Sequence, residues 1–493
     1  MPSKTYAVEP IEPLLRESDP DSTLAPCGIQ RLIIGSEALS VIGEAVSELL
    51  STRQPGRGSG EKPAVALLAD PVRISRRGED IKDVVEEQLG KRFEVSRTVL
   101  DDGHSELHVV DSVLDEAAAA ARGKAAVVAV GGGTISDIAK IAVQRAAADG
   151  TAPVLLTVQT AASVDGYTDD VSVVLRDGVK RTVPSCWPDV VVADTDVIAE
   201  APARMNRAGF GEMTSMFTAP ADWRLASLVG TDRTYSHNAV RLLSTVGLDL
   251  ESCSEGVREG DPDAVASLTR ALALRGIVTG VAGTSAVLSG AEHLISHMLD
   301  QYHAGQGMPT GLHGAQVGAG AVIAASAWEM LFDRLADHGP ARVLPLEQTL
   351  DPERGRRRVL AAFERVDSSL RVADECWRDY SAKLEAIAWE FPRIQALVDR
   401  WGEHHGELRD LVRPAASIAA ALNRAGAAVR LSDLGQHIDP ELTRWAIANC
   451  ALMRNRFTVV DLLMLLGWWE PGDVDEVLER AAAAASAADA GKE

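Results

Sequence analysis

The chain has 493 residues, of which 46% are hydrophobic and 24% charged, so it is long enough for two or more domains with large cores. Its formal net charge of -22 repels nucleic-acid backbones and excludes nonspecific nucleic-acid binding, although a local basic pocket for a phosphorylated substrate stays open. The five cysteines are widely spaced and contain no CxxC pair, which predicts free thiols and a cytoplasmic protein. No apolar stretch approaches the length of a membrane span or a signal peptide, so neither is expected.

Residues 1–200 alternate between short β-type runs and helical patterns. Several runs are continuously apolar, as in parallel strands that helices cover on both faces. The predicted strands are 30–34, 64–69, 93–100, 125–130, 153–158 and 190–193, and helical patterns between them include 81–89 and 107–121. The alternation predicts a doubly wound α/β domain with a mostly parallel sheet. In addition, Asp177-Gly178 between two β-prone runs predicts a hairpin over 171–183.

Residues 201–480 have a different character. Long segments rich in Ala, Leu, Arg and Glu replace the β-branched clusters, which predicts an all-helical second domain. Gly-Pro at 339–340 and Asp-Pro at 351–352 and 439–440 punctuate it. Residues 481–493 form a low-complexity, alanine-rich tail that we expect to fray.

A run of three glycines, Gly131, Gly132 and Gly133, directly follows a predicted strand and precedes a predicted helix. Glycine lets the backbone approach a pyrophosphate and adopt positive φ, and the helix N-terminus offers free N–H groups. The turn is therefore a candidate phosphate-binding site. An ordinary tight turn between strand and helix is the alternative, because the spacing is not GxGxxG.

A second constellation joins histidines to a carboxylate. His293 and His297 are four residues apart and share a helix face, and His313 follows in a separate segment. Two imidazoles and one carboxylate make a catalytic site for a divalent metal with an open coordination position, and Glu212 is a candidate carboxylate. Ordinary surface or core histidines are the alternative, and His303 in a predicted loop could replace His313.

Taken together, these motifs resemble those of the sn-glycerol-1-phosphate dehydrogenases, within the iron-containing alcohol dehydrogenase superfamily and related to glycerol dehydrogenase and dehydroquinate synthase. The matching stretches occur in the family's order and span most of the chain. They are GGGTISDIAK (131–140), TVQTAASVDGYTDDVSVV (157–174), GVKRTVP (178–184), VVADTDVIAEAP (191–202), AGFGEM (208–213), TAPADWRLA (218–226), SGAEHLISH (289–297), LHGAQVGAG (312–320) and MRNRFTVVDLL (453–463).

The resemblance implies a dehydroquinate synthase-like architecture: an N-terminal α/β nucleotide-binding domain, an all-α C-terminal domain and an active site in the cleft between them. It assigns one divalent metal to Glu212, His293 and His313, and contacts with substrate to Asp165 and His297. The residues that it places near NAD or NADP are Gly131, Gly132, Gly133, Asp137, Thr160, Ser163, Asp169 and, on the adenine ribose, Asp70. A turn-forming role for Asp70 before Pro71 is the alternative.

Two positions depart from the family pattern. The family has Asp where this chain has Glu212, and dehydroquinate synthases use Glu there. The family has Ser near the cofactor where this chain has Asp169, and a carboxylate at that place could weaken a phosphate contact by repulsion. The departures leave the superfamily intact but affect the expected substrate.

The implied activity is the metal-dependent, NAD(P)-linked reduction of dihydroxyacetone phosphate to sn-glycerol 1-phosphate, or of a similar small carbonyl compound. Zinc is the expected Lewis acid, with iron or nickel as alternatives. His297 is a candidate proton relay. A substrate phosphate needs cationic donors, for which Lys180 and Arg181 on the predicted hairpin are candidates, although solvated hairpin charges are the alternative.

Two other functions stay open. One is a sugar-phosphate cyclase, which shares the fold, NAD and the metal ligands and which Glu212 favours. The other is a non-catalytic descendant of the fold. Beyond a small-molecule substrate, the partner considered is a second copy of the chain in a homo-oligomer.

Overall fold

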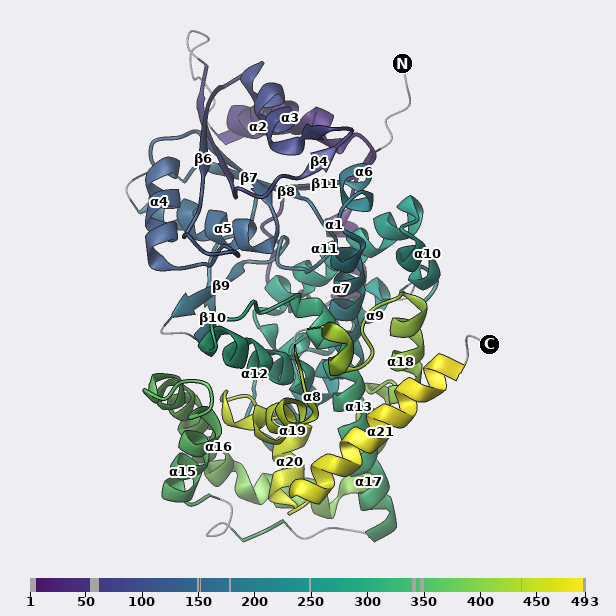
Figure 1. The fold of residues 1–493 in the computed structure, drawn as a ribbon. Helices are drawn as coiled ribbons and strands as arrows, with labels where there is room; N and C mark the ends of the chain where they lie inside the picture. Colours follow the sequence, from purple (N-terminus) through teal and green to yellow (C-terminus); the bar gives the residue numbers. More distant parts are fainter. Residues whose placement is uncertain are drawn as a thin grey trace. The chain divides into compact units, whose positions relative to one another are not determined.

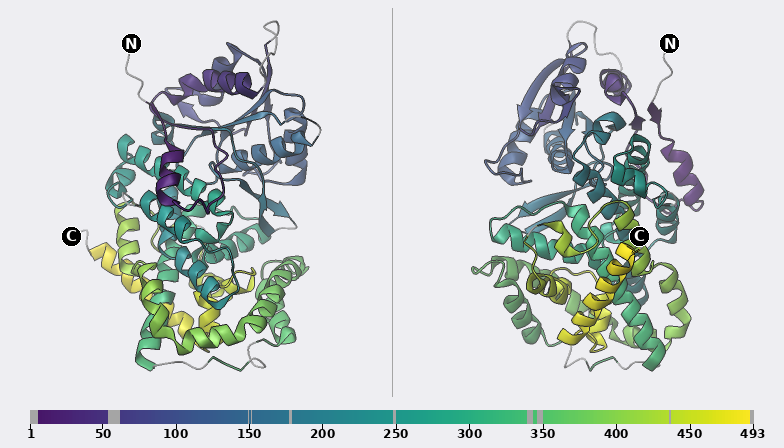
Figure 2. Two further views of the ribbon diagram at one scale, coloured as in Figure 1. Left: turned by 180° about the vertical axis from the view of Figure 1, so that it is seen from behind. Right: turned by 45° about the vertical axis from the view of Figure 1, so that its right-hand side comes forward.

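The computed structural model describes residues 6–53, 62–148, 150, 152–176, 179–247, 250–338, 343–345, 350–435 and 437–490. The chain divides into two compact units, which Figures 1 and 2 show as ribbons. The first unit comprises residues 1–176, 180–209 and 248–281, and the second comprises 177–179, 210–247 and 282–493. The first unit thus includes residues beyond the predicted boundary at 200, because the chain passes through the second unit at 210–247 and then rejoins the first unit at 248–281.

A seven-stranded sheet forms the centre of the first unit, in the order β1-β2-β11-β8-β7-β3-β6. All neighbouring pairs are parallel except β1 with β2. The strands are β1 (Tyr6–Val8), β2 (Arg31–Gly35), β3 (Ala64–Ala69), β6 (Glu94–Val99), β7 (Ala126–Gly131), β8 (Val154–Gln159) and β11 (Val190–Asp194). The six predicted strands agree with the observed ones to within a residue or two, and the predicted α/β class is confirmed. The sequence analysis missed β1, a three-residue edge strand.

Helices cover both faces of this sheet, as the continuous apolar strands require. Helices α2 (Ile42–Arg53) and α3 (Ile81–Gly90) pack with one face in a shared apolar cluster. Helices α4 (Asp111–Ala121) and α5 (Gly133–Ala147) pack with the other. Figure 1 shows these two pairs on opposite sides of the strands. The remaining helices of this unit are α1 (Ile11–Ser18), α6 (Thr195–Ala199), most of α7 (Ala203–Met213), α10 (Ser254–Glu259) and α11 (Pro262–Ala282).

The strand order reverses direction between β3 and β7. The chain moves from β3 outward to β6, then returns to β7 on the other side of β3 and continues to β8 and β11. In open α/β sheets, ligands bind outside the carboxyl ends of the strands at such a switch point. The triple-glycine turn follows β7, and Asp70 follows β3, so both lie at this point.

Two short hairpins accompany the sheet. Strands β9 (Val171–Arg176) and β10 (Val179–Pro184) form the predicted hairpin, whose turn Asp177-Gly178 lies outside the described residues. Strands β4 (Ser75–Arg76) and β5 (Glu79–Asp80) form the other.

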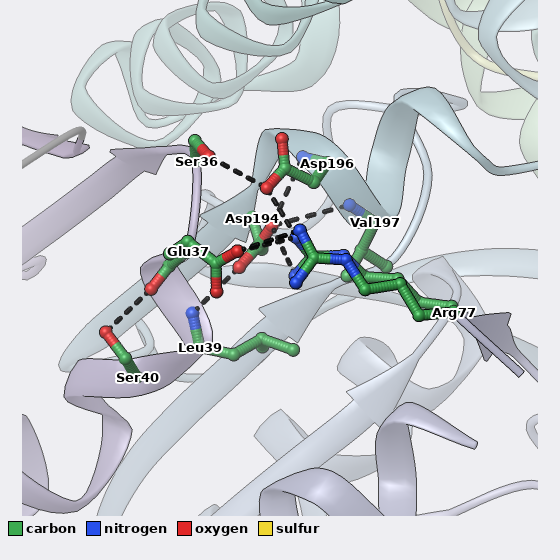
Figure 3. Close-up of polar contacts among 9 residues, drawn as sticks. Ser36, Glu37, Leu39, Ser40, Arg77, Asp194, Asp196 and Val197 are labelled. Carbon is green, nitrogen blue, oxygen red and sulfur yellow. Dashed lines mark hydrogen bonds and ion pairs between the residues drawn. The ribbon is translucent and has the colours of Figure 1, made fainter. Parts of the chain in front are cut away.

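A cluster of charges ties the β4–β5 hairpin to the carboxyl ends of β2 and β11 (Figure 3). The guanidinium of Arg76 contacts the carboxylates of Glu37, Asp194 and Asp196. Ser36 donates to Asp196 over 2.8 Å, and Asp194 accepts the first N–H groups of α6. Strands β2 and β11 lie away from the switch point between β3 and β7 in the strand order. We therefore interpret the cluster as a structural contact that holds the β4–β5 hairpin on the sheet.

The second unit is helical, as predicted. Its long helix α13 (His313–His338) packs against several of the others. The others are α8 (Ala219–Val229), α9 (His237–Val246), α12 (Ala291–Gly305), α15 (Pro352–Phe363), α16 (Arg371–Asp399), α17 (Trp401–Asp410), α18 (Ala415–Arg424), α19 (Pro440–Asn449), α20 (Val459–Leu465) and α21 (Pro471–Ala490). The two predicted Asp-Pro breaks begin α15 and α19, where each Asp caps the helix. The Gly-Pro at 339–340 lies outside the described residues.

The expectation of a frayed tail is wrong for residues up to 490. Helix α21 continues to Ala490 and packs on α13 and α18. Its buried residues recur at helical spacing: Val474, Val477, Ala481, Ala484 and Ala485. These small side chains form an apolar stripe, which the alanine-rich composition alone does not reveal. Asn423 also donates to the carbonyl of Ala488 over 2.7 Å. Residues 491–493 lie outside the described part of the chain.

Two described helices, α11 and α13, are long and apolar enough to cross a membrane by length and composition alone. Their most apolar windows are 83% and 89% buried within the protein. Burial of this extent is typical of core helices, so these two helices are weak evidence for a membrane span.

Glycines allow α7 and α13 to touch backbone to backbone. A Cβ on Gly211 would overlap the carbonyl oxygen of Gly314, and a Cβ on Gly318 would lie 2.9 Å from the Cα of Gly211. Further along α13, a Cβ on Gly320 would lie 2.8 Å from the carbonyl oxygen of Glu292 in α12. The close approach brings Glu212, next to Gly211, toward the first residue of α13, which is His313.

We expect Gly211→Ala to destabilise the fold by about 1–3 kcal/mol, the usual cost of overpacking. The added methyl group must push α7 away from α13, so the variant should also bind zinc more weakly. Denaturant unfolding and zinc titration measure the two effects. Gly406 in α17 has open space where its Cβ would be, so Gly406→Ala is a matched control expected to stabilise by about 0.5–1 kcal/mol. Wild-type stability and zinc affinity in Gly211→Ala would contradict the close packing.

Candidate active site

Three side chains from three helices converge in the second unit. Glu212 lies near the end of α7, His293 in the first turn of α12 and His313 at the start of α13. One ligand atom of each lies within 4.8 Å of the other two. Nε2 of His293 is 3.3 Å from Oε1 of Glu212, and Nε2 of His313 is 3.8 Å from Oε2. The structure therefore brings together the three predicted metal ligands.

This donor set fits a divalent cation. Ligand atoms at about 2.0–2.2 Å from a tetrahedral zinc ion lie about 3.3–3.6 Å from one another, close to the separations of this site. Glu212 and His293 are buried, whereas the His313 side chain is 28% exposed. Two buried ligands would hold a cation in place, and the exposed side would leave access for a further ligand.

The imidazole of His293 carries a proton at the place where a cation would bind. Burial lowers the pKa of its imidazole, but hydrogen bonds to Glu212 and Glu292 outweigh burial and raise the pKa to about 9. At neutral pH the ring is then protonated on both nitrogens, and one proton faces Glu212. A divalent cation takes the place of that proton, so cation binding competes with protons and should weaken as the pH falls.

His297 lies beside the three predicted ligands. Its ring stacks on that of His313 at a centroid distance of 5.5 Å. His297, Asp300 and His313 also have ligand atoms within 4.8 Å of one another, so His313 belongs to both groups. His303 lies within α12 rather than in a loop, and it joins neither group among the described residues.

The predicted cofactor residues of the first unit line the carboxyl edge of three neighbouring strands. Asp70 follows β3, Gly131 ends β7 and Thr160 follows β8, and β7 pairs with both of the other strands. The hydroxyl of Tyr167 donates to the carbonyl of Gly131 over 3.3 Å and bonds to Thr160, which ties two of these segments together. Ser163 is buried in the same segment as Thr160.

The three glycines of the turn differ in their surroundings. None of them has a positive φ, so backbone strain does not require them. A Cβ on Gly131 would lie 2.7 Å from Ile135, and one on Gly133 would lie 2.9 Å from Val164, so both are needed for close packing. Gly132, the N-cap of α5, has no atom within 4 Å of its Cβ position and faces open space. Ser136, one turn on, has a buried hydroxyl without a hydrogen-bond partner among the described residues. The turn therefore fits a pyrophosphate at the N-terminus of α5.

Two predicted cofactor residues, Asp137 and Asp169, bind a buried lysine. Nζ of Lys140 donates to Asp169 over 2.6 Å and lies 3.3 Å from Asp137. Burial raises the pKa of Asp169 to about 7, although Lys140 lowers it. The expected repulsion between Asp169 and a cofactor phosphate is offset by this ion pair. Lys140 belongs to a motif visible in the sequence, but its pairing with the two carboxylates was not predicted.

The structure shows one of the two roles considered for Asp70. Its Oδ1 accepts the N–H of Val72, which forms the turn before β4, and the ammonium of Lys82 over 2.9 Å. Lys82 is buried and also donates to the carbonyl of Asp70 over 2.7 Å. The turn role is thus observed, while the contact with an adenine ribose stays a prediction.

The predicted substrate residue Asp165 pairs with an arginine that the sequence analysis missed. Nη1 of Arg275 lies 2.6 Å from Oδ2 of Asp165, and Arg275 is only 1% exposed. A single charge within the apolar run of α11 was the signal that could have revealed it. Lys180 lies half-buried on β10, and its contact with a substrate phosphate stays a prediction.

Comparison with known proteins places the chain in a family. Residues 45–202 match the model of the iron-containing alcohol dehydrogenases. A glycerol-1-phosphate dehydrogenase [NAD(P)+] of Haloquadratum walsbyi is 34% identical over 244 residues, which cover 48% of this chain and 66% of that protein. A protein of the same name from Halorubrum lacusprofundi is 31% identical over 294 residues, which cover 60% of this chain and 75% of that protein.

Solved structures share the fold. The NADH-dependent butanol dehydrogenase A of Thermotoga maritima has a TM-score of 0.53 and 16% identity, over 93% of this chain and 98% of its own. The glycerol dehydrogenase of Schizosaccharomyces pombe has a TM-score of 0.51 and 14% identity, over 92% of this chain and 88% of its own. The fold, the order of the motifs and the sequence matches together show that the chain belongs to the iron-containing alcohol dehydrogenase family, with the glycerol-1-phosphate dehydrogenases, and is a dehydrogenase.

Proposed function

We propose that this dehydrogenase uses NADH or NADPH and one divalent cation to reduce dihydroxyacetone phosphate, or a similar small phosphorylated ketone, to the alcohol. The convergence of Glu212, His293 and His313 is the observation that carries the proposal. The relatives' names, glycerol-1-phosphate dehydrogenase [NAD(P)+], support the substrate and the nicotinamide cofactor. Zinc is the proposed cation, with iron or nickel as alternatives, because a nitrogen and oxygen donor set accepts all three.

The cation, when bound, supplies a Lewis acid for the carbonyl oxygen of the substrate. Glu212 neutralises one of its charges, and the two imidazoles hold it in place. His297 is the proposed proton donor to the product oxygen, because its ring stacks on His313 and a ring nitrogen lies within 4.8 Å of an Asp300 carboxylate oxygen.

Residues of the first unit hold the cofactor in this proposal. Gly132 leaves room for the pyrophosphate, and the N–H groups of the first turn of α5 bind its oxygens. The free oxygen of the Asp70 carboxylate accepts a hydroxyl of the adenine ribose. Arg275 holds the carboxylate of Asp165 at 2.6 Å and so orients it for a substrate hydroxyl. Lys180 is the proposed partner of the substrate phosphate.

A sugar-phosphate cyclase is the second candidate, and Glu212 is the observation that favours it. A cyclase regenerates its NAD in every cycle, whereas a dehydrogenase converts NADH stoichiometrically. We expect oxidation of NADH or NADPH with dihydroxyacetone phosphate in the presence of zinc, nickel or iron, loss of activity with EDTA and recovery on adding the metal back. The absence of net nucleotide turnover with dihydroxyacetone phosphate, dihydroxyacetone and small aldehydes would contradict the dehydrogenase proposal.

The variant His293→Ala tests the cation site. We expect it to lose both activity and stoichiometric metal, because a buried ligand is removed, while NADH binding persists at the separate glycine turn. Metal analysis and NADH fluorescence measure these effects. His297→Ala is the matched comparison: it should keep the metal and lose about 100- to 10,000-fold in kcat, the usual contribution of a proton-transfer group. Full activity in His293→Ala would refute the site.

The variant Gly132→Val separates a cofactor turn from an ordinary tight turn. Because Gly132 has φ of -76° and an empty Cβ position, valine should fit without loss of thermal stability. The side chain would occupy the proposed pyrophosphate position and should weaken NADH binding at least about 10-fold, a loss of about 1.4 kcal/mol. Unchanged NADH affinity would show that the turn has no cofactor role.

A further inference from the structure

Each histidine of the proposed cation site forms a hydrogen bond through Nδ1, the ring nitrogen that does not face Glu212. For His293 the partner is Glu292, whose Oε1 lies 3.0 Å from Nδ1. The same oxygen accepts the N–H of Gly290 over 2.6 Å, and Oε2 accepts the hydroxyl of Thr218 over 2.9 Å. A carboxylate only accepts hydrogen bonds, so Nδ1 of His293 must carry the proton. The lone pair for a cation is then on Nε2, the atom that faces Glu212.

The support of His313 is neutral. Its Nδ1 lies 3.0 Å from Oγ of Ser296, and Ser296 donates its only proton to Oε1 of Gln316 over 2.7 Å. Nδ1 of His313 must therefore donate to Ser296. Gln316 is fixed in turn by its donation to the carbonyl of Thr310 over 2.7 Å. Both Nε2 atoms consequently face Glu212, and the Nδ1 partner is a carboxylate for His293 and a hydroxyl for His313.

Glu292 lies in the interior, close to other charged groups. Glu292 is fully buried, and its backbone carbonyl lies against α13 where Gly320 leaves no room for a side chain. Burial, together with the charge of Glu292, raises the pKa of neighbouring Asp222 to about 8. The buried guanidinium of Arg456 provides the compensating positive charge for Glu292.

We propose that Glu292 is a positioning residue of the cation site: it holds His293 as the Nδ1–H tautomer and uses its charge to strengthen the bond from Nε2 to the cation. The inference rests on the proposed function of Glu212, His293 and His313 as cation ligands. Carboxylates behind a ligating histidine fix the orientation of the ring and raise its basicity, and their removal weakens metal binding about 10- to 100-fold in other proteins.

The variant Glu292→Gln removes the charge and keeps the hydrogen bonds. The amide oxygen can accept from Nδ1 of His293 and from Gly290, while the amide nitrogen can donate to the hydroxyl oxygen of Thr218. We expect zinc and cobalt(II) affinity, measured by competition with a chelator, to fall about 10- to 100-fold. The visible spectrum of the cobalt(II) protein should shift, and saturating zinc should restore most of kcat.

Glu329→Gln is the matched control. Glu329 lies on α13, the helix of His313, and accepts the N–H of Ala415 over 2.9 Å, away from the cation ligands. This variant should keep the cation affinity and cobalt(II) spectrum of the wild type. Melting of both variants in EDTA checks the fold without cation, and we expect Glu292→Gln to melt close to the wild type.

Wild-type cation affinity and spectrum in a folded Glu292→Gln would overturn the inference. If Glu292→Gln does not fold, Thr218→Val replaces it, since this change removes the hydrogen bond to Oε2 but leaves the charge. It should weaken cobalt(II) binding and broaden the spectrum, and unchanged binding would reject the positioning role. A wild type that binds neither zinc nor cobalt(II) would instead refute the proposed function itself, so the two failures are distinguishable.

Discussion

The candidate site depends on a direct backbone contact between α7 and α13. Gly211 lies against Gly314 and Gly318 with no room for a side chain, and this contact sets the distance between Glu212 and His313. A second glycine contact, between Gly320 and Glu292, sets the position of α12 on α13. Interiors are close-packed, so a single methyl group at these positions would change separations of 3–4 Å, on which cation binding depends.

Buried charges are the second constraint on this fold. Lys140 with Asp169, Lys82 with Asp70 and Arg275 with Asp165 each pair a nearly fully buried cation with a carboxylate. Removal of one partner from such a pair is strongly destabilising, because an uncompensated charge stays in the interior. All three carboxylates were expected to lie near the cofactor or the substrate. In the folded chain, Asp169 is satisfied by Lys140, whereas Asp165 is oriented by Arg275 and still partly exposed.

The glycines of the turn after β7 are small for different reasons. Gly131 and Gly133 are small because Ile135 and Val164 pack against them, and Gly132 is small although nothing packs against it. Packing explains the first two, and the open space at the third supports the proposed cofactor position. The residues of α12 also differ in their proposed roles: Glu292 contacts His293, His293 is the proposed ligand and His297 lies next to His293.

The sequence by itself determined the strands, the helical second half and the family, because apolar runs and ordered motifs are local properties of the chain. It also identified the three residues that meet in the second unit, through their resemblance to a known pattern. Only the tertiary structure decided that Arg275 pairs with Asp165, that Glu292 contacts His293, that Asp169 pairs with Lys140, and that the alanine-rich end packs as α21. These outcomes depend on which side chains of distant segments come into contact and on which charged groups become buried. The spacing of residues along the chain does not reveal these contacts or this burial.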